Sequence, residues 1–211
     1  MLDHLLVDLI RTIRRSLDEA LLQRQAVEER FQVDVFLGDV SWETSYSLPG
    51  EEQPPRVRAD LSVDWPTWIQ TAYRSWSIGE TPTELPEVVV EVAMRIQRLA
   101  EPPAADRVLA VLPTESPLLG RERLVRSSTI VEEVHADPDT DRPGAVPEAP
   151  VVRWAVEASY EGAIRFDEVN LEDPDTLQPV AGILTRWISS TLVQLADLPL
   201  AFLPPDPAED G

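Results

Sequence analysis

The sequence contains no cysteine, no lysine and a single asparagine, Asn170. Without cysteine, the chain cannot form disulfides, thiolate metal sites or a thiolate nucleophile. Its only two histidines, His4 and His135, are far apart and lack a partner pattern such as HExxH. A histidine-based triad or a zinc site is therefore not expected. A glycine-rich phosphate loop and a GxSxG sequence are absent too, so no enzyme class is indicated.

The charge is strongly one-sided, with 38 acids against 18 bases and a net charge of -20. High-GC coding favours arginine over lysine, and a cytoplasm at molar salt favours surface carboxylates, because they keep a protein soluble where screening is strong. The composition therefore indicates a high-GC host and is typical of halophiles. It also argues against sequence-specific nucleic-acid binding, because no basic stripe is available for counterion release.

The length of 211 residues suggests one domain that needs no disulfides or structural metal ions, since a chain of this size buries roughly 70% of its unfolded surface. The sequence opens directly into an amphipathic pattern that does not resemble a signal peptide. No apolar run reaches membrane-spanning length. We therefore expect no membrane contact.

The N-terminal segment predicts a helix. Apolar residues recur every three or four positions from Leu2, and this pattern runs to about Glu29. Three arginines, Arg11, Arg14 and Arg15, form the one basic patch of this helix. We interpret the patch as a solvated face with local ion pairs.

Two alternating segments follow the helix. Between residues 31 and 48 the apolar side chains switch from odd to even positions at Gly38, which predicts a bulge or a tight bend there. Residues 57–65 alternate cleanly and predict a half-buried strand, antiparallel to the preceding one if the turn between them is a hairpin. Pro66 cannot donate to a ladder, so the strand leaves the sheet there or runs at its edge.

The remaining elements are predicted from periodicity and turn signals. We expect a second helix over 84–100, strands over 107–113, 123–136 and 151–166, and a third helix over 174–196 with Asp173 as its N-cap. The predicted fold class is α+β, a mostly antiparallel sheet packed against the N-terminal helix and the second helix, with an additional C-terminal helix. Residues 1–169 form the α+β domain, and residues 170–211 add the C-terminal helix and an acidic, proline-rich tail packed on it.

An acidic loop over 137–150 holds the best metal candidate in the sequence. Three aspartates follow the DxDxD spacing of a calcium loop, and a glutamate falls at the twelfth position: Asp137, Asp139, Asp141 and Glu148. Arg142, however, stands where such a loop needs glycine, and prolines stiffen the segment. We favour a solvated loop, keep calcium as the weaker alternative and expect no cofactor.

The aromatic residues fall into two groups. Trp65, Trp154 and Trp187 lie on apolar faces of predicted strands and of a predicted helix, which favours core packing. Between residues 68 and 76, tryptophan, tyrosine and arginine occur close together, and these types are enriched at interface hot spots. We therefore predict an interface formed by Trp68, Tyr73, Arg74 and Trp76. Core packing and a base-stacking platform are the alternatives, and the net charge disfavours the second.

The order of elements resembles the tail-terminator proteins of tailed phages and the related caps of contractile injection systems. The resemblance runs through "VDVFLGDVSWETSYSLPG", "VRADLSVDW", "VVVEVAMRIQRL" and "VVRWAVEASYEG" and covers residues 1–162. The match lies in the order of the elements and in the spacing of their apolar residues. It implies a homo-oligomeric ring, typically a hexamer, that closes the tail tube and joins it to the head or neck while letting DNA pass. Tail-tube proteins and neck or portal-side proteins would be its partners.

Three functional classes are left open by the sequence. The first is a structural, non-enzymatic ring component of a viral tail or neck, assembled in the host cytoplasm and carried in the virion. The second is a cytoplasmic α+β protein-interaction module of a halophilic or high-GC prokaryote. The third is an enzyme without a recognisable motif, which would need a pocket holding acids with shifted pKa values.

Overall fold

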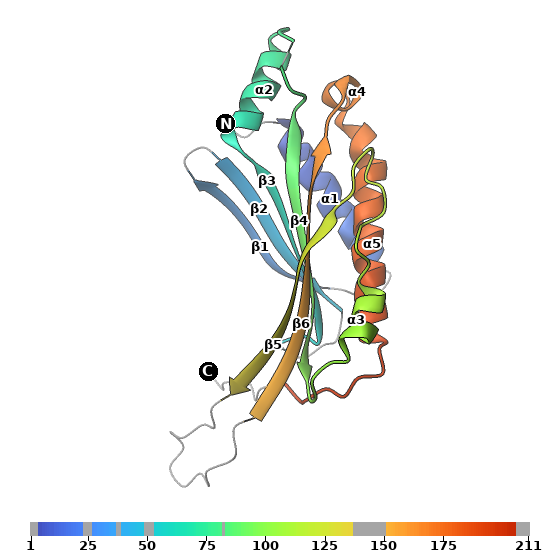
Figure 1. Cartoon of the computed structure of the whole chain (residues 1–211). Helices are drawn as coiled ribbons and strands as arrows, with labels where there is room; N and C mark the ends of the chain where they lie inside the picture. The colour runs from blue at the N-terminus through green and yellow to red at the C-terminus, as the bar shows by residue number, and fades with distance from the viewer. Residues whose placement is uncertain are drawn as a thin grey trace.

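The computed structural model describes residues 4–22, 27–36, 39–48, 53–81, 83–136 and 151–205. It is an α+β fold in which a six-stranded antiparallel sheet carries its two long helices on one face (Figure 1). The helices are α1 (His4–Leu22), α2 (Thr67–Ser77), α3 (Ala105–Val111), α4 (Glu168–Glu172) and α5 (Gln178–Ala196), with a 3-10 turn η1 (Pro174–Leu177) before α5. The strands are β1 (Val27–Phe36), β2 (Asp39–Ser47), β3 (Val57–Trp65), β4 (Glu87–Leu99), β5 (Val125–Ala136) and β6 (Val151–Arg165).

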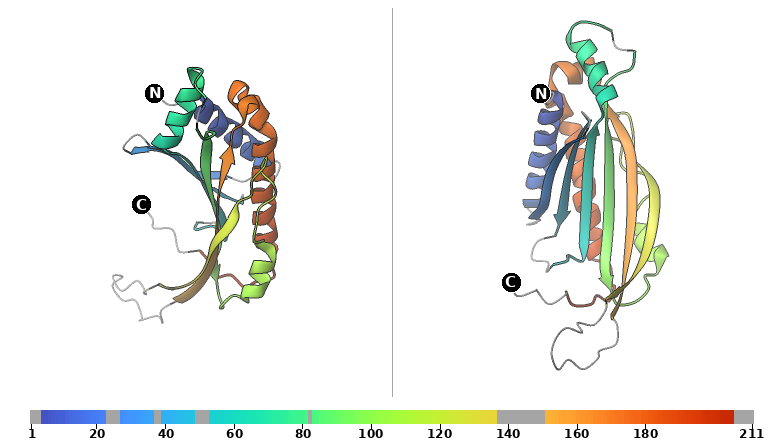
Figure 2. Two further views of the ribbon diagram at one scale, coloured as in Figure 1. Left: turned by 45° about the horizontal axis from the view of Figure 1, so that its top comes forward. Right: turned by 90° about the vertical axis from the view of Figure 1, so that its left-hand side faces the viewer.

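The strand order is β1-β2-β3-β4-β6-β5, so the first four strands form a meander and β6 lies between β4 and β5. All five neighbouring pairs are antiparallel. The sheet therefore ends in β1 on one side and β5 on the other. The views in Figure 2 show its strong twist, and they show that α1 and α5 lie together behind it while the other face is open.

The core lies between this sheet and the α1–α5 pair. Strand β3 buries every second residue, from Val57 to Trp65, while the residues between them are half-buried on the open face. Helix α1 adds residues at helical spacing that are at most 1% exposed: Leu5, Leu6, Leu9 and Ile13. The alternation predicted for residues 57–65, their antiparallel pairing with β2 and the departure of the chain from the sheet at Pro66 are confirmed.

The helix predicted over 84–100 is wrong, because most of this segment is the central strand β4. Its apolar residues fit both the helical repeat of about 3.6 residues and the strand repeat of two. The helical stripe through Val88, Val92 and Ile96 is also a set of even positions. The even positions from Val88 to Ile96 are all buried. Four valines within residues 88–92 favour a strand, since β-branched side chains fit a pleated surface.

Two further elements differ from the prediction. Residues 107–113 were predicted as a strand but fall largely in α3, where Val108 and Leu112 are both fully buried at a helical spacing of four. The N-terminal helix ends at Leu22, and residues 27–29 already belong to β1. Strands over 125–136 and 151–165 and the C-terminal helix are confirmed, with Asp173 capping the 3-10 turn. Gly38 lies outside the described residues.

The chain after α5 is fixed to the end of β4 by Arg98. This residue is only 7% exposed and has a left-handed backbone, with φ of 63°. Its guanidinium donates to the carbonyl oxygen of Leu203 from Nε and Nη2, at 3.1 and 2.7 Å, and to that of Pro54 from Nη1, at 3.0 Å. The donors of this nearly buried guanidinium are thereby satisfied by carbonyl oxygens.

Gly162 in β6 supplies a testable packing constraint. A Cβ at this position would lie 2.9 Å from the backbone oxygen of Arg123 and 2.9 Å from a methyl of Leu124. We predict that Gly162→Ala lowers the free energy of unfolding by about 2 kcal/mol, because the crossing backbone must shift. In the matched control Gly182→Ala, the new methyl meets nothing within 4 Å. Helix propensity should then raise stability by about 1 kcal/mol. Urea unfolding followed by tryptophan fluorescence measures both, and equal effects would contradict the prediction.

Candidate interaction surfaces

Helix α2 is held against the sheet at its first residue. The carboxylate of Asp39, at the start of β2, accepts hydrogen bonds from the backbone N–H of Thr67 at 2.5 Å and from its hydroxyl at 2.7 Å. These bonds stabilise the ionised form and lower the pKa of Asp39. Pro66 precedes the helix with an extended backbone, so the chain turns from β3 directly into α2.

A series of contacting aromatic rings extends from the core into α2. The ring of Tyr73 meets Trp65 edge-on, with centroids 5.9 Å apart, and it stacks on Trp76 at 6.0 Å. On its other side Trp65 contacts Phe166 at 5.9 Å. Tyr73 and Trp76 are half-buried against the core, so their apolar surface contributes to the packing of α2 on this chain.

The structure therefore separates the four predicted interface residues. Trp68 is 57% exposed on the side of α2 that faces away from the core. Arg74 is also exposed, and its Nη2 donates to the side-chain oxygen of Gln70 at 3.1 Å. Tyr73 and Trp76 lie on the side of α2 that packs against the core. An interface formed by all four residues stays a prediction, with Trp68 as its most accessible member.

Other exposed apolar residues lie near α2 and were not singled out by sequence pattern. Ile78, just after α2, is 73% exposed, and Leu85 before β4 and Val169 in α4 are exposed too. Figure 1 shows α2 and α4 at the same end of the molecule. We call this set the α2 end: Trp68, Ile78, Leu85 and Val169. The only signal in the sequence was a few isolated apolar residues in loops, which are common on any surface.

A second apolar region lies at the far end, on the ribbon of β5 and β6. Val134 and Val151 are 43% and 42% exposed, and their register places both on the open face of the sheet. We call this pair the arm tip. Figure 1 shows the free end of this ribbon pointing away from α2. The molecule thus carries two unlike apolar surfaces at its opposite ends.

Of the predicted core tryptophans, Trp65 and Trp187 are buried, at 1% and 7% exposed. Trp187 of α5 meets the ring of Tyr160 edge-on at 5.0 Å, which joins α5 to β6. Trp154 is half-buried against the same core. The predicted core packing is therefore confirmed for Trp65 and Trp187, and Trp154 lies at the rim.

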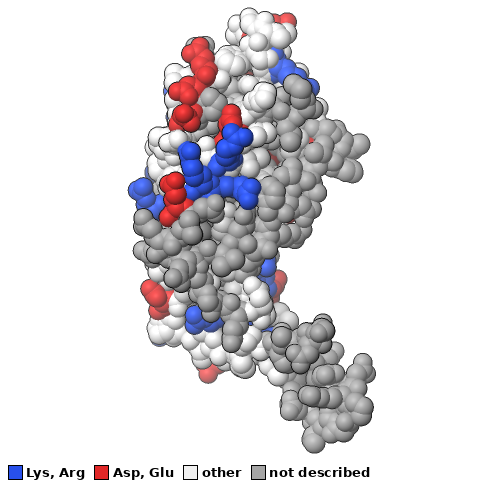
Figure 3. Space-filling model, turned by 180° about the vertical axis from the view of Figure 1, so that it is seen from behind, with Lys and Arg blue, Asp and Glu red and all other residues white. Residues whose placement is uncertain are grey.

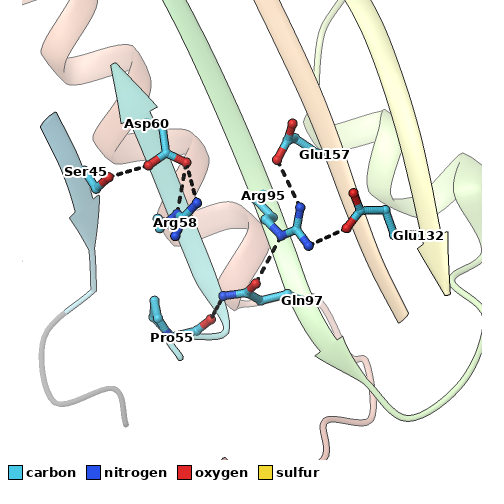
Figure 4. A network of polar contacts seen from close by, with 8 residues as sticks. All are labelled: Ser45, Pro55, Arg58, Asp60, Arg95, Gln97, Glu132 and Glu157. Atoms are coloured by element: carbon cyan, nitrogen blue, oxygen red, sulfur yellow. Dashed lines mark hydrogen bonds and ion pairs between the residues drawn. The ribbon is translucent and has the colours of Figure 1, made fainter. Parts of the chain in front are cut away.

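The open face of the sheet is polar and largely paired with itself (Figure 4). Arg95 binds Glu132 of β5 at 2.5 Å and Glu157 of β6 at 3.2 Å, so one guanidinium joins three strands. On β3, Asp60 pairs with Arg58 at 2.9 Å and accepts a hydrogen bond from the hydroxyl of Ser45. Glu91 and Arg95 would be neighbours one turn apart on a helix, whereas four residues along strand β4 separate them by roughly 13 Å, and Arg95 pairs across strands instead.

A row of acids crosses the same face. The register places Glu43, Ser62, Glu91 and Glu161 opposite one another on β2, β3, β4 and β6. Burial raises the pKa of Glu91, and the charges of Glu161, Asp64 and Glu43 raise it further. A shallow groove of about 300 Å³ runs along this face, from Glu43 past Asp60 to Ala93. Within the described part of the chain, no three histidine, aspartate or glutamate side chains are grouped so as to hold a metal.

The basic patch predicted on the N-terminal helix lies on α1. Arg11 and Arg15 are exposed, and Arg11 pairs with Asp8 at 2.8 Å, one turn earlier, as expected for a solvated face. Figure 3, seen from the side of α1 and β1, shows basic side chains gathered near the middle of this face with acids around them. The calcium candidate Asp137, Asp139, Asp141 and Glu148 lies outside the described residues. None of the described helices is long and apolar enough to cross a membrane.

Comparisons with protein-family models, with curated proteins and with solved structures found no match for this chain. The surfaces described above therefore have to support a functional proposal by their own geometry.

The acid row predicts a pH-dependent stability. Because the pKa of Glu91 is raised in the folded state, its contribution to stability is complete below the unfolded pKa and is lost as pH rises through the folded value. We expect Glu91→Gln to stabilise the protein at pH 7 by on the order of 0.5 kcal/mol, after allowance for solvent screening. Near pH 3 we expect no such gain.

Thermal melts from pH 3 to pH 7 measure this difference. The control Glu101→Gln removes the same charge from an exposed position outside the row. A gain of equal size in both variants would mean that net charge alone is responsible, and a gain for Glu91→Gln that persists at pH 3 would contradict the assigned cause.

Proposed function

We propose that this protein is a structural, non-enzymatic ring component of a viral tail or neck, similar to tail terminators. In this proposal, copies of the chain form a closed homo-oligomeric ring, a hexamer, that joins the tail tube to the head or neck. The ring is assembled in the host cytoplasm and carried in the virion. Tail-tube proteins and neck or portal-side proteins are its proposed partners.

The observation that carries the proposal is the pair of unlike apolar surfaces at opposite ends of the molecule. The α2 end exposes an indole and three aliphatic side chains, and the arm tip exposes two valines. A contact between two different patches is heterologous, and repetition of such a contact closes into a ring when the rotation allows it. The exposed apolar side chains at the two ends give each copy two candidate contact surfaces.

Charge supports the same proposal. A net charge of -20 gives the surface a field that repels the phosphate backbone, so DNA could pass through a ring of such subunits without adhering. Outside the acid row, the described acids of the open face pair with arginines or with hydroxyls, which suits a rigid structural surface better than a catalytic cleft. Residues 88–99, one of the segments that carry the resemblance to tail terminators, form strand β4 and not a helix.

The first experiment is the native mass by light scattering, in molar salt and in dilute buffer. We expect a closed oligomer of about six copies in molar salt, since salt screens the repulsion between acidic subunits. A protein that stays monomeric in both buffers, at the highest concentration reached, would contradict self-assembly. Binding to one unlike partner as a monomer would favour the interaction-module alternative.

Two substitutions in α2 test where the ring contact lies. Trp68→Ala removes a side chain that is 57% exposed, so we expect loss of the ring with an unchanged melting temperature. Trp76→Ala removes a ring stacked on Tyr73 and should lower the free energy of unfolding by about 2 kcal/mol. If Trp68→Ala unfolds the protein, or leaves the ring intact, the α2 end is not the seam.

A further inference from the structure

Strand β5 presents a free backbone edge. Its inner edge pairs with β6 along its whole length. At its outer edge, the backbone N–H of Arg126 donates to the carbonyl oxygen of Thr114 at 2.9 Å, and Glu115 bridges to Val125. Among the described residues, nothing pairs with the outer edge from Ser127 to Ala136. Such an edge is a template for another strand.

Apolar side chains occupy both faces at the middle of this free edge. Ile130 is 45% exposed on the open face, and Val131 is 48% exposed on the helix face. A soluble monomer commonly protects a long edge strand with charges or a covering segment. Here the covering segment ends at Arg126, and the acids Glu132 and Glu133 lie beyond the apolar centre.

We propose that two copies of this chain pair edge to edge through β5, antiparallel and about a two-fold axis at Ile130. The two six-stranded sheets then form one continuous sheet. The pairing covers residues 127–133 of each copy and is limited by the segment that already occupies the edge at Arg126.

The register follows from the sequence of the strand. Directly opposite residues must lie on the same face, so the axis can pass only through a residue and not between two. An axis at Ile130 places Ser128 opposite Glu132 of the second copy and Ser127 opposite its Glu133. The hydroxyl of Ser128 can then donate to the carboxylate of Glu132 of the second copy, a charge-assisted hydrogen bond beside the ion pair that Glu132 makes with Arg95 of its own chain.

Neighbouring registers are less favourable. An axis at Glu132 or Glu133 places like charges directly opposite, which destabilises a strand pair. An axis at Val131 places Glu132 opposite Ile130, so its carboxylate meets an aliphatic side chain of the second copy instead of a hydroxyl. An axis at Thr129 shortens the pairing, because the edge at Arg126 is already occupied. Ile130 is therefore the centre at which the strand is complementary to itself.

This contact is distinct from the ring contact proposed above. It is isologous and uses the backbone of residues 127–133, whereas the ring contact is heterologous and uses the α2 end and the arm tip. If both form, two rings are joined back to back. If the ring proposal fails, the edge contact predicts a simple dimer, and Trp68→Ala should leave that dimer intact.

Cysteine cross-linking tests the register, because the chain has no cysteine of its own. In Ile130→Cys the two introduced residues lie directly opposite, with Cα atoms about 5 Å apart, which suits a disulfide. In the control Ser128→Cys the same atoms are roughly 14 Å apart across the pair, too far for a bond. Under mild oxidation we expect a covalent dimer from Ile130→Cys only. No cross-link at residue 130, or equal cross-linking at both positions, would overturn the proposal.

Opposite charges at one exposed position give a second, independent measurement. Ser128→Glu places two carboxylates opposite each other twice in the dimer, and Ser128→Arg places a guanidinium opposite Glu132 twice. In low salt we expect the dissociation constant from sedimentation equilibrium to rise about ten-fold for the first and fall about ten-fold for the second. Molar salt should reduce both shifts. Changes of the same sign in both variants, or no change in either, would contradict the predicted opposition.

Discussion

The packing of α1 and α5 together over one face of the sheet is the interaction on which the rest of the structure depends. These helices come from opposite ends of the described chain, and among the described residues they supply the large apolar cover of the sheet. Burial of β3, β4 and β6 on that face removes apolar side chains from water, which is the main driving force for folding. The same one-sided cover leaves the other face of the sheet to water.

The polar organisation of the molecule follows from that asymmetry. On the uncovered face, charged side chains can remain hydrated, and Arg95 joins β4, β6 and β5 where no apolar layer holds them. The acid row through Glu91 is tolerated on this face because solvent still reaches it. The α2 end, the arm tip and the β5 edge lie beyond the reach of α1 and α5, so their exposed apolar groups and free backbone are left available for other chains.

Some elements could be predicted because only one period fitted them. Residues 57–65 alternate without exception, and the N-terminal and C-terminal helices repeat at three and four. Residues 87–99 satisfied both periods, and only the need for a strand beside β3 decided between them. Tertiary contact also decided α3. Its buried residues Val108 and Leu112 belong to an element that contacts α5, and the local pattern does not reveal this contact.

The sequence by itself determined the α+β class, the long helices, the acidic surface and the absence of thiol chemistry. Each of these depends on composition or on a local period, which need no knowledge of neighbours. The tertiary structure decided that Trp76 packs inward while Trp68 remains outside, and that β5 lies at an edge with β6 beside it. Exposure and strand order depend on contacts between residues far apart in the chain, and side-chain type alone does not specify them.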